Sequence, residues 1–254
     1  MGRYSHSKLS TFEQCPYKFK LRYIEKIIPE IEKSIEMHLG NAIHEALEWL
    51  YLEIVQAKQT PTLDELIMFY INRWQDGYNE DILVVKNHLN AKDYFNMGIK
   101  FLIDYYTEHQ PFKDGTLEVE KEIHVTLGKH KIIGYIDRLV RNPLTGEFEI
   151  HDYKTGGTLP TQEKMDQDRQ LALYSIAIKE LFGEEKNVCL VWHYLAHNEK
   201  LCSRRTNEEL AKLKKETLEL IEKIENAKEF PTKRSGLCDW CEYKNICPAF
   251  NLNP

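Results

Sequence analysis

The sequence predicts a mixed α/β fold, in which a central mixed sheet is flanked by helices. Segments with the two-residue alternation of strands gather between about residues 115 and 205, and segments with the spacing of helices lie on both sides of them. The 254 residues are enough for one large domain. We therefore expect a single domain over 1–254, with a helical block at about 39–110, a sheet-containing core at about 115–205 and a cysteine-bearing loop at about 236–250.

Capping boxes and apolar spacing predict the helices that precede the sheet. In a capping box, a Ser or Thr side chain and an acidic side chain three residues later satisfy each other's exposed backbone N–H groups. Ser10–Glu13 predicts the start of a first helix, and Thr62–Glu65 predicts the start of another that ends near Asp76. Apolar residues at steps of three and four predict further helices at 39–59 and at about 91–109.

Three strands are predicted next, in the form of an antiparallel meander. Apolar and polar residues alternate along 117–127, and 131–140 and 147–154 are strand-like as well. The last two are joined by 142–146, where Pro and Gly indicate a turn.

The remaining elements alternate between helix and strand. We expect a helix at 162–182 that ends before Gly183, and strands at 187–196 and 200–204. A last capping box, Thr206–Glu209, opens a charged helix that extends to about residue 228.

Composition excludes several classes of protein. Hydrophobic residues make up 42% and charged residues 29%, which is the balance of a globular chain rather than a disordered or fibrous one. No apolar run reaches the roughly 18 residues of a membrane span, and the first residues lack the apolar stretch of a secretory signal. We therefore expect a cytoplasmic protein without a membrane anchor. The net charge of −6 requires any nucleic-acid contact to come from a local patch.

Two acidic residues stand out on the predicted strands. Asp152 and Lys154 are two positions apart on one strand, so their side chains project on the same face, at the end of an apolar strip. Asp137 ends the apolar run 132–136 on the neighbouring strand. Two carboxylates on adjacent strands suit Mg²⁺ or Mn²⁺, which take oxygen ligands.

The register of the turn decides whether the two acids meet. A simple register through 142–146 puts Asp137 opposite His151, and this would leave Asp137 and Asp152 on different faces of the sheet. A shared cation therefore requires a bulge or a slip of one residue. The alternative interpretation is a surface ion pair between Asp152 and Lys154, with Asp137 capping a turn.

Three more polar residues fit the same site. His44 follows Gly40 by one helical turn, and a neutral imidazole can add a nitrogen ligand to carboxylates, although a single histidine of this kind is more often a packing residue. Gln170 and Tyr174 lie four residues apart on one helix face, where they can hydrogen-bond a phosphate or Lys154; alone they are an ordinary helix face.

In their order along the chain, these motifs resemble the PD-(D/E)XK nuclease superfamily. The motifs are Gly40 to His44-Glu45, Gly134-Tyr135-Ile136-Asp137, Asp152-Tyr153-Lys154-Thr155-Gly156, and Gln170 with Tyr174. The Asp-Tyr-Lys-Thr-Gly version is most similar to the RecB-type exonuclease branch, which includes AddB nuclease domains and CRISPR-associated adaptation nucleases. The resemblance implies a restriction-endonuclease-like fold, with the nuclease core at about 115–205.

The resemblance also implies a role for each residue. His44, Asp137 and Asp152 would be ligands of Mg²⁺ or Mn²⁺, together with the backbone carbonyl of Tyr153. Lys154 would be the catalytic lysine. The helical motif of Gln170 and Tyr174 would complete the catalytic set.

The cysteines suggest a second metal centre. Cys238, Cys241 and Cys247 lie within ten residues, but an iron–sulfur cluster or a structural Zn²⁺ ion usually takes four ligands. Cys15, just before Pro16, is the best candidate for the fourth. The RecB-type branch has a similar set of one N-terminal and three C-terminal cysteines around a 4Fe–4S cluster. Zn²⁺ bound by the same four thiolates is the alternative.

The resulting hypothesis is a metal-dependent DNA exonuclease that acts on single strands or free ends. The alternatives are a CRISPR adaptation nuclease that trims captured DNA ends, although those more often carry Glu at the position of Asp152, and a catalytically silent DNA-binding module with a structural cluster. The chain has no Gly-x-x-x-x-Gly-Lys-Ser/Thr motif, so ATP-driven unwinding would require a separate helicase partner.

Overall fold

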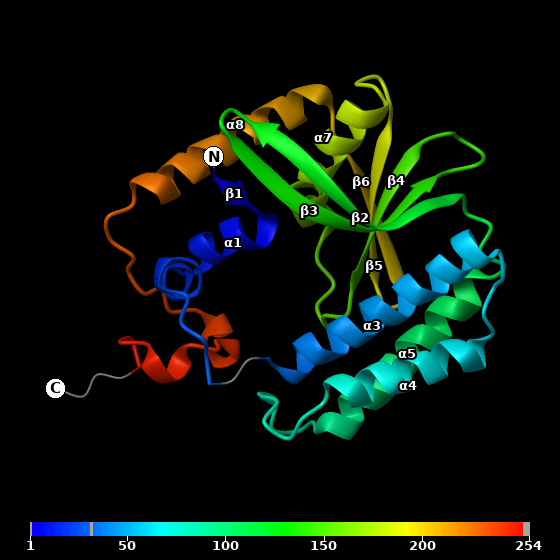
Figure 1. Cartoon of the computed structure of the whole chain (residues 1–254), viewed down its shortest axis with the longest axis horizontal. Coiled ribbons are helices and arrows are strands. Elements are labelled where there is room, and N and C mark those ends of the chain that lie inside the picture. Colours follow the sequence, from blue (N-terminus) through cyan, green and yellow to red (C-terminus); the bar gives the residue numbers. More distant parts are fainter. Residues whose placement is uncertain (1, 31–32, 251–254) are drawn as a thin grey trace.

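The computed structural model describes residues 2–30 and 33–250. A six-stranded mixed sheet stands between two groups of helices, as predicted (Figure 1). The strands are β1 (Arg3–Tyr4), β2 (Thr116–Leu127), β3 (His130–Arg141), β4 (Phe148–Lys154), β5 (Val188–Tyr194) and β6 (Glu199–Arg204). The helices are α1 (His6–Gln14), α2 (Pro16–Phe19), α3 (Ile35–Leu52), α4 (Leu63–Gly77), α5 (Ala91–His109), α6 (Gln162–Asp166), α7 (Gln170–Phe182) and α8 (Asn207–Asn226).

Four short helical segments complete the chain. Two are π-helical and extend α2 and α3, and two are 3₁₀ turns near the C-terminus. They are η1 (Lys20–Glu25), η2 (Glu53–Ala57), η3 (Gly236–Trp240) and η4 (Lys244–Ile246). None of the described helices is long and apolar enough to cross a membrane.

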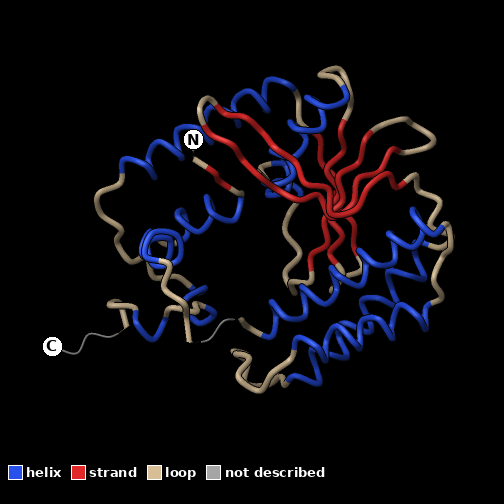
Figure 2. Tube along the Cα trace, in the orientation of Figure 1, coloured by secondary structure: helices blue, strands red, loops and turns tan. Residues whose placement is uncertain are grey.

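The sheet is mixed because its connections differ. Strands β2, β3 and β4 form the predicted antiparallel meander, whereas β5 runs parallel to β4 and β6 antiparallel to β5. Short β1 pairs in parallel with the first residues of β3. The parallel β4–β5 pair needs a crossover, which α6 and α7 supply. Figure 2 shows the strands of the sheet, in red, with helices on both sides.

Two apolar cores hold the helices in place. One joins the sheet to α1, α7 and α8 through buried residues such as Leu9, Leu173 and Ile221. The other joins α3, α4 and α5 through residues such as Leu47 and Tyr70, and it also includes Tyr153 of the sheet. Strand β4 therefore lies where both cores meet.

Two expectations about helices were wrong. The first helix begins at His6, not at Ser10, because Ser5 accepts a hydrogen bond from the backbone N–H of Lys8 and caps the helix without an acidic partner. The expected helix at 162–182 is interrupted between α6 and α7. There the Asp168 carboxylate accepts from the N–H of Leu171, and such local capping competes with a continuous helix.

The capping boxes at Thr62–Glu65 and Thr206–Glu209 are confirmed, as is the helix at 91–109. The predicted helix at 39–59 begins earlier, at Ile35, and its last turns are the π-helical η2.

Candidate functional site

The ends of β3 and β4 bring the two strand acids together. Backbone pairing puts Arg138 opposite His151 and Arg141 opposite Phe148. This register is shifted by one residue from the simple one, so Asp137 and Asp152 follow as the next positions along the two strands. The slip required by a shared site is therefore present.

Three side chains converge beside this point. Ligand atoms of His44 on α3, Glu120 on β2 and Asp137 on β3 all lie within 4.8 Å of one another, the one such group of three found among the described residues. Nδ1 of His44 lies 3.3 Å from Oδ2 of Asp137. One imidazole nitrogen and carboxylate oxygens form a donor set that suits Mg²⁺ or Mn²⁺.

The main chain of Tyr153 holds two of these side chains. Its backbone N–H donates to Oδ2 of Asp137 at 3.0 Å. Nε2 of His44 lies 2.8 Å from its carbonyl oxygen, and an N–H donated there leaves Nδ1 as the acceptor that faces Asp137. A metal-binding histidine usually donates its other ring N–H to such an oxygen. Here the Tyr153 carbonyl, expected as a ligand, contacts His44.

Glu120 was missed by the sequence analysis. It lies in an alternating strand between Glu118 and Glu122, where it looks like a residue of the solvent face. Its backbone φ is +46°, which is uncommon for a residue other than glycine. Strained backbone conformations of this kind cluster at functional sites. The strand alternation alone gives no signal for such a residue.

The buried Asp152 forms an ion pair with the partly exposed Lys154 next to this group. The Asp152 side chain is 4% exposed, and its Oδ2 lies 2.7 Å from Nζ of Lys154. That oxygen makes no other contact of hydrogen-bonding geometry within the described residues, so it has acceptor capacity left for a ligand. Asp152 lies outside the compact group of three, but its charge acts on Asp137.

The predicted helical motif reaches the same place from α7. Nζ of Lys154 donates to Oε1 of Gln170 at 3.3 Å, and Gln170 stands at the first position of α7 because the helix restarts there. Tyr174 is buried and packs against Gly134 of β3, where an added Cβ would lie 2.3 Å from its ring. The structure thus brings Asp137, Asp152, Lys154, Gln170 and Tyr174 close together.

The electrostatics of the site favour cation binding. Burial and the neighbouring charge of Asp152 raise the pKa of Asp137 to about 7. Burial also raises the pKa of Glu120, with a further contribution from the charge of Glu48. Burial by itself lowers the pKa of Lys154, but the charge and the hydrogen bond of Asp152, together with the charges of Asp137 and Asp168, outweigh this effect and raise the pKa, so the ammonium is retained.

An open cleft leads to the group along α3. Its walls carry Glu36, Glu45 and Glu48 in addition to the three converging residues. A cluster of uncompensated carboxylates is unfavourable for a bare polyanion, and a cation offsets that repulsion.

His6 is a second residue that the sequence analysis did not single out. It opens α1, and it is close enough to Arg169 and Lys154 for their charges to act on it. Burial is the main cause that lowers its pKa to about 4, and the two positive charges add to the effect, so the imidazole is neutral. Its Nδ1 is buried without a hydrogen-bond partner in the described part of the chain.

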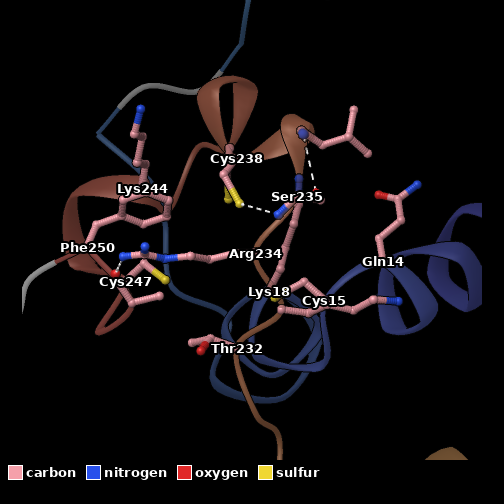
Figure 3. A pocket seen from close by; sticks show the side chains of 14 residues that line it. Gln14, Cys15, Lys18, Thr232, Arg234, Ser235, Cys238, Lys244, Cys247 and Phe250 are labelled. Atoms are coloured by element: carbon pink, nitrogen blue, oxygen red, sulfur yellow. Dashed lines mark hydrogen bonds between the residues drawn. The ribbon is translucent and has the colours of Figure 1, made fainter.

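The four cysteines of the predicted second centre line one pocket. Cys15 stands between α1 and α2, and it faces the C-terminal loop that carries Cys238, Cys241 and Cys247 (Figure 3). No three of these sulfur atoms lie within 4.8 Å of one another in the described residues. Lys18 joins the two segments through Glu242 at 2.6 Å.

The other two cysteines lie outside this pocket, on β5 and β6. Cys189 is buried, whereas Cys202 is exposed. Strand β6 is an edge strand of the sheet, so one of its sides has no neighbouring strand.

Comparisons with known proteins give one family match and similar solved structures. The family model of the PD-(D/E)XK nuclease superfamily matches residues 3–248. No curated protein sequence matches the chain. Among solved structures, a "putative exonuclease" from Eubacterium rectale is similar in fold, with 14% identity, a TM-score of 0.56 and coverage of 94% of this chain and 86% of that one. The SSO0001 structure is 15% identical, with a TM-score of 0.45 and coverage of 98% and 86%.

The family match spans nearly the whole chain and includes every motif residue gathered at the ends of β3 and β4. The protein therefore belongs to the PD-(D/E)XK nuclease superfamily.

Proposed function

We propose that the protein is a divalent-metal-dependent DNA exonuclease that hydrolyses phosphodiester bonds of single-stranded DNA or of DNA ends. The observation that carries this proposal is the convergence of His44, Glu120 and Asp137 within 4.8 Å, next to the Asp152–Lys154 pair. The preference for single strands and ends follows from the RecB-type resemblance of the Asp-Tyr-Lys-Thr-Gly motif.

His44, Glu120, Asp137 and the carboxylate of Asp152 would hold the cation. A bound Mg²⁺ or Mn²⁺ ion supplies Lewis-acid activation of the phosphate and offsets developing charge. Glu120 adds an oxygen ligand to the set implied by the resemblance.

Lys154 acts as a charged donor in this proposal. Because its pKa is raised, it stays protonated at neutral pH and cannot serve as a general base. Its ammonium can instead orient the attacking water and stabilise negative charge on the phosphate. Gln170 orients the ammonium, because its Oε1 accepts a hydrogen bond from Nζ of Lys154 at 3.3 Å.

We also propose that Cys15, Cys238, Cys241 and Cys247 bind a 4Fe–4S cluster. All four line one pocket. A tetrahedral Zn²⁺ site with Zn–S bonds near 2.3 Å would need sulfur atoms about 3.8 Å apart. No three of these sulfur atoms lie that close together among the described residues, and the choice of a 4Fe–4S cluster follows from the RecB-type resemblance. The cluster would fasten the N-terminal helices to the C-terminal loop.

Cleavage assays test the nuclease proposal. End-labelled linear DNA and circular single-stranded DNA are incubated with Mg²⁺, with Mn²⁺ or with EDTA. We expect metal-dependent shortening of linear single strands and no attack on circles, and Glu120→Gln should be strongly impaired. Glu122→Gln is the matched control, because it neutralises an exposed acid two positions along the same strand.

The outcomes separate the alternatives. Retention of DNA without shortening under all metal conditions would indicate a silent binding module and contradict the proposal. Removal of only a few nucleotides from captured ends would favour the adaptation nuclease. Iron and acid-labile sulfide measurements on the purified protein test the cluster, and stoichiometric zinc without iron would contradict it.

A further inference from the structure

Arg138 is a fully buried charged residue to which neither the motifs nor the proposed mechanism give a role. It is 1% exposed and follows Asp137 on β3. We infer that Arg138 is a positioning residue for the metal centre, which acts by fixing Tyr153. This inference rests on the proposed function, since it concerns the same centre.

The guanidinium uses its fork of donors on several partners at once. Its Nε donates to the Tyr153 hydroxyl at 2.9 Å, and one terminal nitrogen donates to Nδ1 of His151 at 2.8 Å. The other terminal nitrogen donates to Oγ1 of Thr116 at 3.2 Å and is ion-paired with Asp114. A planar group held at several points cannot rotate, so it defines where the Tyr153 hydroxyl can lie.

Such a group is costly to bury and needs an explanation. Asp114 is the one carboxylate paired with Arg138 among the described residues, and the ring of Tyr51 covers the guanidinium at 4.2 Å. Replacing a buried ion pair by apolar residues of similar volume is often neutral or stabilising. Stability alone therefore does not account for an arginine between the sheet and α3.

Tyr153 links this buried network to the metal centre. Its hydroxyl accepts from Arg138 and lies 3.2 Å from the hydroxyl of Tyr105 on α5. Its backbone N–H and carbonyl contact Asp137 and His44 on the other side. The described backbone pairing between β3 and β4 ends at Arg138 and His151, one residue short of the two acids. Beyond that point, side-chain contacts must hold β4 against β3.

Asp137 and Arg138 lie on opposite faces of β3 and have different roles. Successive side chains of a strand point to opposite faces, so the residue that anchors the strand and the residue that binds the cation are neighbours in sequence. Groups that hydrogen-bond metal ligands directly typically change metal affinity by about 10- to 100-fold when they are removed, and Arg138 acts one contact further away, so the lower end of this range is expected. This sets the size of the expected effect.

Mn²⁺ titration without DNA tests the inference independently of cleavage. Tyr153→Phe removes the hydroxyl but keeps the ring and the main chain, and we expect Mn²⁺ affinity to fall about tenfold. Arg138→Lys keeps the charge but loses the fork, and a similar loss is expected. Thr116→Val is the matched control, since it removes a contact of Arg138 that does not involve Tyr153 and should change affinity by less than about twofold. Thermal unfolding in EDTA checks that each variant is folded.

A double-mutant cycle gives the decisive result. If Arg138 acts through Tyr153, the double variant binds Mn²⁺ no more weakly than Arg138→Lys alone. Losses that multiply, or wild-type affinity in Tyr153→Phe, would overturn the inference and leave the proposed function intact. Absence of Mn²⁺ binding by the wild-type protein would overturn the metal centre of the proposed function itself, and the inference with it.

Discussion

Asp137 accepts a hydrogen bond from the backbone N–H of Tyr153 and, through the same Oδ2 atom, lies 3.3 Å from Nδ1 of His44. This one oxygen therefore joins β3, β4 and α3. Any cation held by Asp137 is fixed relative to all three elements, which come from distant parts of the sequence.

The first prediction concerns pH. The pKa of Asp137 is raised from 3.8 to about 7, so the folded protein binds this proton more tightly than the unfolded chain does. The contribution of this carboxyl to stability without metal is largest below about pH 4 and is lost as pH rises toward 7. Metal binding must expel the proton, so Mn²⁺ affinity should rise about tenfold per unit up to about pH 7 and then level off. Calorimetric titrations from about pH 5.5 to 8 would measure this. Constant affinity over that range contradicts the prediction.

The second prediction concerns Lys154. We expect Lys154→Met to reduce the cleavage rate at least 100-fold, as the loss of a preorganised donor does elsewhere, while DNA binding changes little. Because the buried Asp152 loses its ionic partner, the variant should also unfold more easily without metal. Single-turnover cleavage and gel-shift assays measure the two effects. Lys164→Met is the control, since Lys164 is exposed on α6. Full activity of Lys154→Met would refute the role.

The third prediction concerns the contact between β3 and α7. A Cβ on Gly134 would meet the Tyr174 ring at 2.3 Å, so Gly134→Ala must displace Tyr174 or the strand. We expect a loss of about 1–3 kcal/mol in the free energy of unfolding and reduced cleavage. Gly156→Ala adds the same methyl group where nothing lies within 4 Å, and serves as the control. Equal urea midpoints for both variants would show that the close contact is not maintained.

The fourth prediction concerns the cysteine pocket. Cys15→Ser should lose iron and lower thermal stability, because a cluster between Cys15 and Cys238 closes a loop of more than 220 residues, with a length-dependent entropy of roughly 5 kcal/mol. Cys202→Ser should keep its iron, since Cys202 lies on β6 away from the pocket. Iron content and melting temperature are measured together. Full iron content in Cys15→Ser would remove this residue from the ligand set.

Local sequence patterns predicted the helices and strands, because the formation of these elements depends on residues that are close together in the chain. The boxes at Thr62 and Thr206 fix helix starts, since the partners are three residues apart. The box proposed at Ser10 failed, because Ser5 offers an earlier cap and the local pattern cannot rank the two. The i, i+2 spacing likewise placed Asp152 and Lys154 on one face of a strand.

The site could be predicted only in part. The motif residues were found through their resemblance to a family, but Glu120 was not, because its turn toward His44 depends on a left-handed backbone conformation within a strand. In the sequence, Arg138 is simply a basic residue that follows an acidic one, and nothing local indicates that it is buried. Its burial depends on the helices that cover it.

The sequence by itself determined which segments become strands and helices, and which residues carry the donors for a cation, because side-chain chemistry and periodicity are properties of short stretches. The tertiary structure alone decided that β4 is shifted by one residue against β3, that His44 faces Asp137, and that Cys15 reaches the C-terminal cysteines. These relations depend on packing free energy summed over contacts far apart in the chain, and no local pattern contains that sum.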